Sequence, residues 1–498
     1  MPKQPSSFVL ALPPRTSGTS AAQWLCGALR DEILDGRLRP GSRLPSSRDL
    51  ARQQGLSRGT VVSAFDQLRS EGYVQGSTGS GTYVSTVLPD DLLQVRQRRA
   101  ASREVAMTPP RRRLSGFAMA ATLFPGLAPV PTRAFRAHLT ALDLFPTSLW
   151  AQLAGRRLRR ATTSLLLGCD PVGYRPLQNA VAEYLVASRG VKCVPEQVAI
   201  VSGTQESLDL AAHLFLSPGD RVCVENPGYV GARRAFEAVG ARVTSIDVDD
   251  EGAAVPPARL TDVRLVYLTP GHQFPLGVCM SLSRRLAMLE WARRTGAILF
   301  EDDYDSEYRY AGKPVPALQG LDRHGVVLFA GSFSKVLFPG LRLGYLIVPP
   351  DLVERVMAIQ SIRTRHAPML TQSVLCDFIA QGHFARHVRR MREIYAERLG
   401  ALLDAARERL AGALTITGVE AGLQTAAWLA AGYDAARIEA LAAQRGVDVT
   451  SLGRYTHVPV RRQGLHLGFA AVDVTEIRRG VRELASVLDR SGTRLRHR

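Results

Sequence analysis

The sequence of 498 residues predicts an α/β protein in two parts, a small N-terminal helical module with a hairpin and a larger α/β body. Helical patterns and two short strands fill the module, whereas the body alternates short apolar runs with amphipathic stretches, as mostly parallel sheets covered by helices do. The chain is also too long for one hydrophobic core. We therefore expect a module at 20–86, a linker at 87–115 and a body at 116–490, with a large domain at about 165–350 and a smaller α+β domain at about 351–490.

Composition excludes several classes of protein. Apolar residues make up 46% of the chain, yet no apolar run approaches the ~20 residues of a membrane span. The start of the chain lacks a signal-peptide pattern, so we expect a cytoplasmic protein. Six cysteines are scattered without the spacing of a disulfide framework or a metal site. We expect reduced thiols and no metal.

The module begins with three helical patterns. Apolar residues recur at helical spacing from Trp24 to Leu34, and Gly36 ends that helix. Ser46 is placed to cap a second helix, and Ser57 to cap a third that stops at Gly72. Two short alternating strands follow, at 73–75 and 82–84, around a glycine-rich tip. This order predicts a winged helix-turn-helix.

Basic residues are concentrated in this part of the chain. The net charge is +18, and residues 1–115 hold seventeen Lys and Arg against nine Asp and Glu. Such a surplus suits a nucleic-acid partner, although charge alone does not decide it. A helical module used for protein contact, with Arg48 and Arg58 as solvated charges, is the alternative.

Three runs resemble the GntR-type DNA-binding domain: Leu44-Pro-Ser-Ser-Arg48, Leu56-Ser-Arg-Gly-Thr-Val61 and Gly79-Ser-Gly-Thr-Tyr-Val84. The resemblance implies a double-stranded DNA operator as partner. It implies that Arg58 contacts a base edge, since arginine is suited to bidentate contact with guanine. By the same resemblance Thr60 contacts phosphate, Gly79 brings the wing backbone to the minor groove, and Arg48 and Ser57 also lie at the DNA.

A charged, proline-bearing segment at 87–115 separates the two parts and is expected to be an exposed linker. Buried strands are predicted beyond it, followed by long helices from 354 to 409 and a mixed segment to about 488. The predicted strands are 198–201, 221–224, 241–244, 265–268, 297–300, 326–329 and 343–348.

Lys335 is the most informative residue of the body. The chain contains only four lysines, Lys3, Lys192, Lys313 and Lys335, and otherwise carries its positive charge as arginine. Lys335 stands in Ser332-Phe-Ser-Lys335, shortly before Pro339-Gly-Leu-Arg342. An amine forms Schiff bases, which a guanidinium does not, so the pattern favours a chemical role over that of an ordinary surface lysine.

Five segments, in order, resemble fold-type I aminotransferases, which depend on pyridoxal 5'-phosphate (PLP). They are Ser202-Gly-Thr-Gln-Glu206, Glu225-Asn-Pro-Gly-Tyr229, Thr269-Pro-Gly-His-Gln-Phe-Pro-Leu-Gly277, Glu301-Asp-Asp-Tyr304 and the Ser332–Arg342 segment. The resemblance implies a body of that fold type, with PLP held by Lys335 as an aldimine. By the same resemblance, Tyr229 stacks on the PLP ring, Asp302 pairs with the ring nitrogen, and Tyr304 hydrogen-bonds the phenolic oxygen. The residues that would bind the phosphate are Gly203, Thr204, Gln205, Ser332 and Arg342.

Three positions depart from the aminotransferase pattern. His466 stands where these enzymes carry an arginine that holds the substrate carboxylate, and histidine offers no bidentate fork. Gly168 replaces a tyrosine, and Phe274 replaces an asparagine near the ring oxygen, for which His272 or Gln273 could substitute. We expect His466 and His272 to contact an effector.

A GntR-like module joined to an aminotransferase-like body resembles the MocR/GabR family of bacterial transcriptional regulators. The resemblance implies a head-to-tail homodimer. We expect an amine or amino-acid effector, or PLP itself, to be sensed through Lys335. The alternatives are a working aminotransferase with an accessory DNA-binding domain, against which His466 counts, and a PLP-free scaffold, against which the complete set of PLP-binding residues counts.

Overall fold

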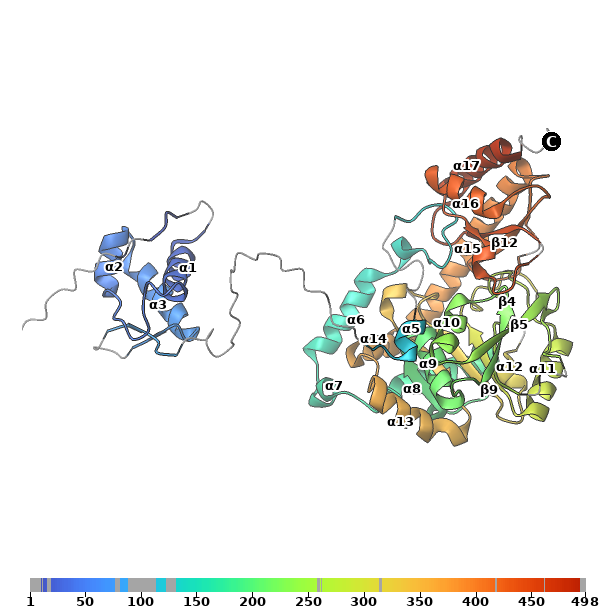
Figure 1. Ribbon diagram of the computed structural model, residues 1–498, viewed down its shortest axis with the longest axis horizontal. Coiled ribbons are helices and arrows are strands. Elements are labelled where there is room, and N and C mark those ends of the chain that lie inside the picture. The colour runs from blue at the N-terminus through green and yellow to red at the C-terminus, as the bar shows by residue number, and fades with distance from the viewer. Residues whose placement is uncertain are drawn as a thin grey trace, which may run out of the picture. The chain divides into compact units, whose positions relative to one another are not determined.

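The computed structural model forms two compact units, residues 1–111 and 112–498, which are described separately (Figure 1). The predicted linker, apart from residues 87 and 113–115, and Gly79 lie outside the described residues. Within the described part, no helix has the length and apolar character to cross a membrane. The described residues are 10, 12–15, 19–76, 81–87, 113–121, 131–257, 260, 262–312, 316–416, 419–460 and 462–492.

The first unit contains three helices and a hairpin: α1 (Ala21–Leu34), α2 (Ser47–Gln54), α3 (Arg58–Ser70), β1 (Val74–Gln75) and β2 (Tyr83–Val84), the two strands antiparallel. The predicted caps are confirmed, since the Ser46 hydroxyl accepts from Asp49 N–H and the Ser57 hydroxyl from Thr60 N–H. Leu29, Leu50 and Phe65 belong to its apolar core. The helices and hairpin of a winged helix-turn-helix are therefore present.

An eight-stranded sheet forms the centre of the second unit. Its five strands β9, β8, β7, β4 and β5 are parallel neighbours, whereas β10 runs antiparallel between β3 and β9, and β6 is antiparallel to β5. In spatial order the strands are β3 (Val198–Val201), β10 (Gly344–Ile347), β9 (Val327–Ser332), β8 (Ile298–Asp303), β7 (Val263–Leu268), β4 (Arg221–Asn226), β5 (Arg242–Asp249) and β6 (Gly252–Ala253).

Apolar cores cover both faces of this sheet. Along β7, Leu265 and Tyr267 pack into one core, and Val266 and Leu268 into another, as the alternation of a strand requires. The helices of this part are α5 (Gly116–Ala120), α6 (Thr147–Arg159), α7 (Thr163–Leu167), α8 (Arg175–Arg189), α9 (Thr204–Phe215), α10 (Val230–Ala238), α11 (Leu282–Thr295), α12 (Leu318–Leu321), α13 (Val353–Arg363) and α14 (Met369–Ala380).

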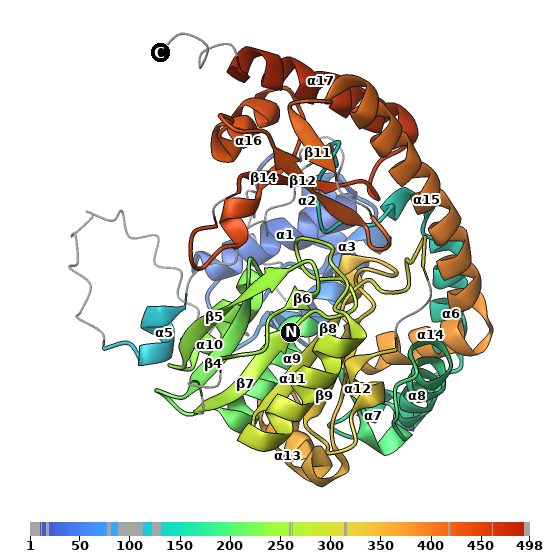
Figure 2. The ribbon, with the colours of Figure 1, turned by 90° about the vertical axis from the view of Figure 1, so that its right-hand side faces the viewer.

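A smaller antiparallel sheet lies in the C-terminal part of the second unit, in the order β11 (Leu414–Ile416), β12 (Gln424–Leu429), β14 (Gly464–Gly468), β13 (Thr450–Ser451). The helices α15 (His383–Arg409), α16 (Ala435–Gln444) and α17 (Val474–Gly492) accompany it (Figure 2). Phe135, which precedes the strands of the large sheet in the sequence, forms an isolated antiparallel β-bridge with Gly468 at the end of β14. Both α13 and α14 pack on large-domain helices, α9 and α8, although the predicted domain boundary near residue 351 precedes them.

Candidate functional site

Lys335 follows the carboxyl end of β9, where open α/β sheets bind ligands. Its amine donates a 2.7 Å hydrogen bond to the backbone carbonyl of His138. Burial lowers the pKa of the Lys335 amine to about 8, a shift that the charges of Asp305 and Asp302 oppose without cancelling. About a tenth of this amine is therefore uncharged and nucleophilic at pH 7, far more than for an ordinary lysine.

Asp302 lies on the neighbouring strand, β8, with its carboxyl group buried. One oxygen, Oδ2, accepts a 2.8 Å hydrogen bond from the Tyr267 hydroxyl, whereas Oδ1 has no partner among the described residues. Burial raises the pKa of Asp302 to about 7. A buried carboxyl oxygen without a partner suits a positively charged N–H donor, as the protonated ring nitrogen of PLP would be.

Gly203, Ser332 and Arg342 converge at the beginning of α9. Gly203 has a φ of +120°, and a Cβ there would lie 3.8 Å from Arg342 Nη1 and 3.9 Å from Ser332 Oγ. Among the described residues, no side chain caps the first turn of α9, which Thr204 and Gln205 begin. Free backbone amides at a helix N-terminus beside a guanidinium suit a phosphate group. These residues fit the phosphate of PLP.

Tyr229 contributes an aromatic face to the same site. Gln205 Nε2 donates a 3.1 Å hydrogen bond to the Tyr229 hydroxyl, and the ring centroid of Tyr229 lies 5.9 Å from that of Phe274. Burial raises the pKa of Tyr229 to about 12, so the phenol stays neutral. Gly231 leaves the room for this arrangement, because a Cβ there would lie 2.2 Å from Gln205 Nε2.

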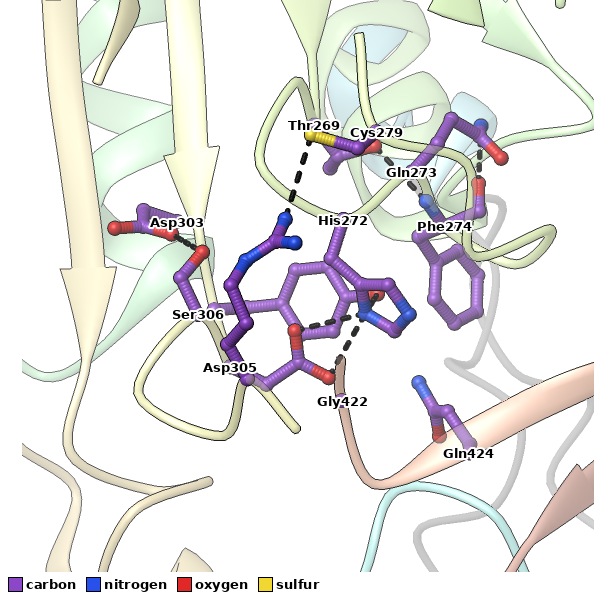
Figure 3. Close-up of polar contacts among 12 residues, drawn as sticks. Thr269, His272, Gln273, Phe274, Cys279, Asp303, Asp305, Ser306, Gly422 and Gln424 are labelled. Atoms are coloured by element: carbon purple, nitrogen blue, oxygen red, sulfur yellow. Dashed lines mark hydrogen bonds and ion pairs between the residues drawn. The ribbon is translucent and has the colours of Figure 1, made fainter. Parts of the chain in front are cut away.

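The buried pair of Asp305 and His272 (Figure 3) supports Tyr304. His272 Nδ1 lies 2.9 and 3.1 Å from the two Asp305 carboxylate oxygens and 3.1 Å from the Tyr304 hydroxyl. Because an ionised carboxylate only accepts, Nδ1 carries the hydrogen and donates to it. The Tyr304 oxygen then accepts from the same N–H, which leaves the phenolic hydrogen for another partner. Gly422 is required beside this pair, since a Cβ there would lie 2.0 Å from His272 Cε1.

His466 lies on β14 and is fully buried. Its Nδ1 is 3.2 Å from the Tyr455 hydroxyl, and its Nε2 has no partner among the described residues. Burial, with smaller contributions from the neighbouring His272 and Lys335, lowers the pKa of His466 to about 3. Burial also lowers the pKa of His138 well below its ordinary value. Both imidazoles are therefore neutral at pH 7.

Gly168, at the position of the family's tyrosine, has no room for a larger residue. It has a φ of +111°, and a Cβ there would lie 2.5 Å from His366 Nε2. A tyrosine at this position would collide with His366 and strain the backbone.

Apart from Gly79, which lies outside the described residues, the predicted DNA-contacting residues lie in or next to α2 and α3. Arg48 and Arg58 are exposed in the first turns of these helices. Ser57 and Thr60 use their hydroxyl groups locally, at 2.8 Å from one another, to cap α3. Arg30 ties α1 to the end of α3 through a 2.5 Å ion pair with Glu71.

Sequence reasoning missed four residues that the structure brings to the cofactor site: Tyr267, Asp305, His138 and Tyr455. A polar residue within the apolar run of β7 was the available signal for Tyr267, and proximity to Tyr304 was the signal for Asp305. His138 and Tyr455 come from distant segments, and no local pattern marks them.

Both parts of the chain match known families. The model for class I and II aminotransferases matches residues 144–484, and that for bacterial regulatory proteins of the gntR family matches residues 22–84. The probable rhizopine catabolism regulatory protein MocR of Rhizobium meliloti is 40% identical over 460 residues, covering 92% of this chain and 92% of that relative. The chain belongs to the MocR/GabR family of transcriptional regulators.

Other relatives agree with this assignment. The pyridoxine biosynthesis regulator PdxR of Corynebacterium glutamicum is 30% identical over 471 residues, and the match covers 94% of this chain and 96% of that relative. The α-aminoadipate aminotransferase LysN of Thermus thermophilus, solved with N-(5'-phosphopyridoxyl)-L-leucine, has a TM-score of 0.65 at 30% identity, covering 71% of this chain and 91% of that chain. The predicted fold class of this MocR-type chain is confirmed, and its GntR domain implies DNA binding.

Proposed function

We propose that this MocR-type protein binds PLP at Lys335 and regulates transcription by sensing an amine or amino-acid effector, or PLP itself. The observation that carries the proposal is the meeting of three features at one edge of the sheet. They are a nucleophilic lysine, a buried Asp302 oxygen without a partner in the described residues, and a phosphate-binding site formed by Gly203, Ser332 and Arg342. Each matches a different part of PLP.

The residues of the site have distinct roles in this proposal. Arg342, Ser332 and the first amides of α9 hold the phosphate, and Tyr229 packs on the ring. Asp302 keeps the ring nitrogen protonated, and Tyr304 donates its phenolic hydrogen to the ring oxygen. When bound, PLP supplies a carbonyl carbon that exchanges reversibly between primary amines.

Regulation requires a second step, in which occupancy of the site alters DNA binding. An effector shifts a conformational equilibrium only if its affinity for the two conformations differs. We infer a head-to-tail homodimer with two DNA-binding modules that meet two operator half-sites. The arginines Arg48 and Arg58 would contact the DNA with Ser57, Thr60 and Gly79. A protein that binds bacterial DNA works in the cytoplasm.

The visible absorption spectrum of the purified full-length protein with added PLP tests the cofactor site. We expect a yellow band in the unaltered protein and in Lys192→Ala, which removes an exposed lysine. The band should be lost in Lys335→Ala. The absence of a band in the unaltered protein would contradict the PLP proposal and favour the PLP-free scaffold. Steady conversion of amino acids to keto acids would instead favour the aminotransferase alternative.

A further inference from the structure

Uncharged rings surround His466 near the Lys335 amine. The ring centroids of His138, Phe274 and Tyr455 lie 5.6, 5.4 and 5.3 Å from that of His466. The backbone carbonyl of His138 accepts the hydrogen bond from Lys335, so this group of four rings adjoins the reactive amine. We call His138, Phe274, Tyr455 and His466 the ring cluster.

The ring cluster offers no cation to a carboxylate. His466, with its pKa near 3, is neutral at pH 7. The two arginines closest in sequence to members of the ring cluster, Arg136 and Arg454, are paired with Asp448 at 3.5 Å and Glu439 at 2.8 Å. A carboxylate buried here would find no charged partner in the ring cluster or in these two arginines, and burying a carboxylate without such a partner is strongly unfavourable.

The free nitrogen of His466 nevertheless requires a hydrogen-bonding partner. If the Tyr455 hydroxyl donates to Nδ1, the Nε2 position carries a hydrogen and donates. In the other tautomer, Nε2 accepts. A hydroxyl group can pair with either form because it both donates and accepts, whereas an ionised carboxylate can pair only with the donor form. An uncharged hydroxyl therefore suits His466 in both of its neutral states.

We propose that the site beside Lys335 selects primary amines that lack a carboxylate and present a hydroxyl group to His466. This inference rests on PLP binding as proposed above and names the chemical class of the effector. With PLP bound, the nitrogen of an incoming amine would bond to the PLP carbonyl carbon as the bond from that carbon to the Lys335 nitrogen breaks, which would release Lys335 as a free amine. The exchange is balanced without an oxidant or a reductant.

Three amines that differ in one group test this selection. L-phenylalaninol carries a hydroxymethyl group, L-phenylalanine carries a carboxylate in its place, and phenethylamine carries neither. Each is titrated into the full-length PLP-bound protein while the visible band is followed. We expect L-phenylalaninol to act at concentrations at least tenfold lower than L-phenylalanine, and at lower concentrations than phenethylamine. The thermal unfolding midpoint at saturating amine provides a second readout.

A charge placed at His466 should reverse the preference. In His466→Arg, L-phenylalanine is expected to bind at least tenfold more tightly than L-phenylalaninol, because the guanidinium holds a carboxylate in a bidentate manner. His324→Arg places the same residue at an exposed histidine and should keep the original order. The comparison of amines in the unaltered protein stands even if His466→Arg does not fold.

The outcomes separate the two proposals. The absence of a Lys335-dependent band overturns PLP binding and, with it, the inference. If the band forms but L-phenylalanine acts as well as L-phenylalaninol in the unaltered protein, only the selection against carboxylates is overturned. If phenethylamine acts as well as L-phenylalaninol, the hydroxyl contact with His466 is wrong.

Discussion

The lowered pKa of the Lys335 amine gives a pH-dependent prediction. Only the uncharged amine attacks PLP, and with a pKa near 8 its fraction grows about tenfold per pH unit below that value. We expect the rate of PLP capture to rise from pH 6 and to level off above pH 8. Stopped-flow absorbance measures this rate. A rate that keeps rising toward pH 10.5 would show that Lys335 behaves as an exposed lysine.

A methyl group at Gly203 should weaken PLP binding. The Cβ would point toward Arg342 and Ser332, where the phosphate is proposed to lie, so Gly203→Ala is expected to raise the Kd for PLP at least tenfold. Gly219→Ala is the matched control, because Gly219 also has a positive φ, +94°, but has open space around its Cβ position. Both substitutions place alanine at a positive φ and so share the backbone strain. Fluorescence titration measures the Kd for PLP of each variant, and a Kd raised only in Gly203→Ala would show the steric effect.

Sequence patterns predicted the residues of the site that stand in short local motifs. Lys335, Asp302 and Tyr304 follow predicted strands, and parallel strands bring their carboxyl ends together. His138 could not be predicted in this way, because it is 197 residues from Lys335 and meets it through a backbone carbonyl. The neutrality of His466 also depends on burial among rings, which the sequence does not display.

At the scale of the element, α3 gives a prediction about DNA. Arg58 is exposed in its first turn, whereas Arg69, in its last turn, pairs with Asp66 at 2.8 Å. Arg58→Ala is expected to weaken binding to an operator by about 1–3 kcal/mol and to relax its sequence preference. Arg69→Ala should change binding little. Fluorescence anisotropy, on duplexes selected from a random library by the unaltered protein, makes the comparison. Equal losses in both variants would contradict a base contact by Arg58.

The elements themselves were largely predictable, and their direction was less so. The caps at Ser46 and Ser57 mark α2 and α3, and the apolar runs mark the strands of the large sheet. The antiparallel direction of β10 was not predicted, because an apolar run carries no direction. Its reason lies in the short connection after β9, which lacks the helix that usually returns a chain for a parallel partner.

For the whole molecule, coupling between the two units must be reciprocal. If an amine changes operator affinity by some factor, operator DNA must change the affinity for that amine by the same factor. We expect a factor of about 5–150, the usual range of such coupling. Titration of the visible band with L-phenylalaninol, with and without saturating operator, measures the change in affinity for the amine. Fluorescence anisotropy, with and without saturating L-phenylalaninol, measures the change in affinity for the operator. An amine that binds equally well with and without the operator would be excluded as an effector.

PLP binding at Asp302, as proposed above, would also affect the abundance of the protein. Its neighbours on the strand are compensated, since Glu301 accepts hydrogen bonds from the backbone amides of Leu318 and Gln319, and Asp303 pairs with Arg189 at 2.7 Å. Asp302 Oδ1, buried and without a partner among the described residues, is therefore the group that is costly to bury. A ligand that binds only the folded state stabilises it, by about 2.7 kcal/mol at a hundred times its Kd. In cells short of vitamin B6, more of the chain would unfold and be degraded. The dose of the regulator would then follow the nutritional state of the cell before any promoter is occupied.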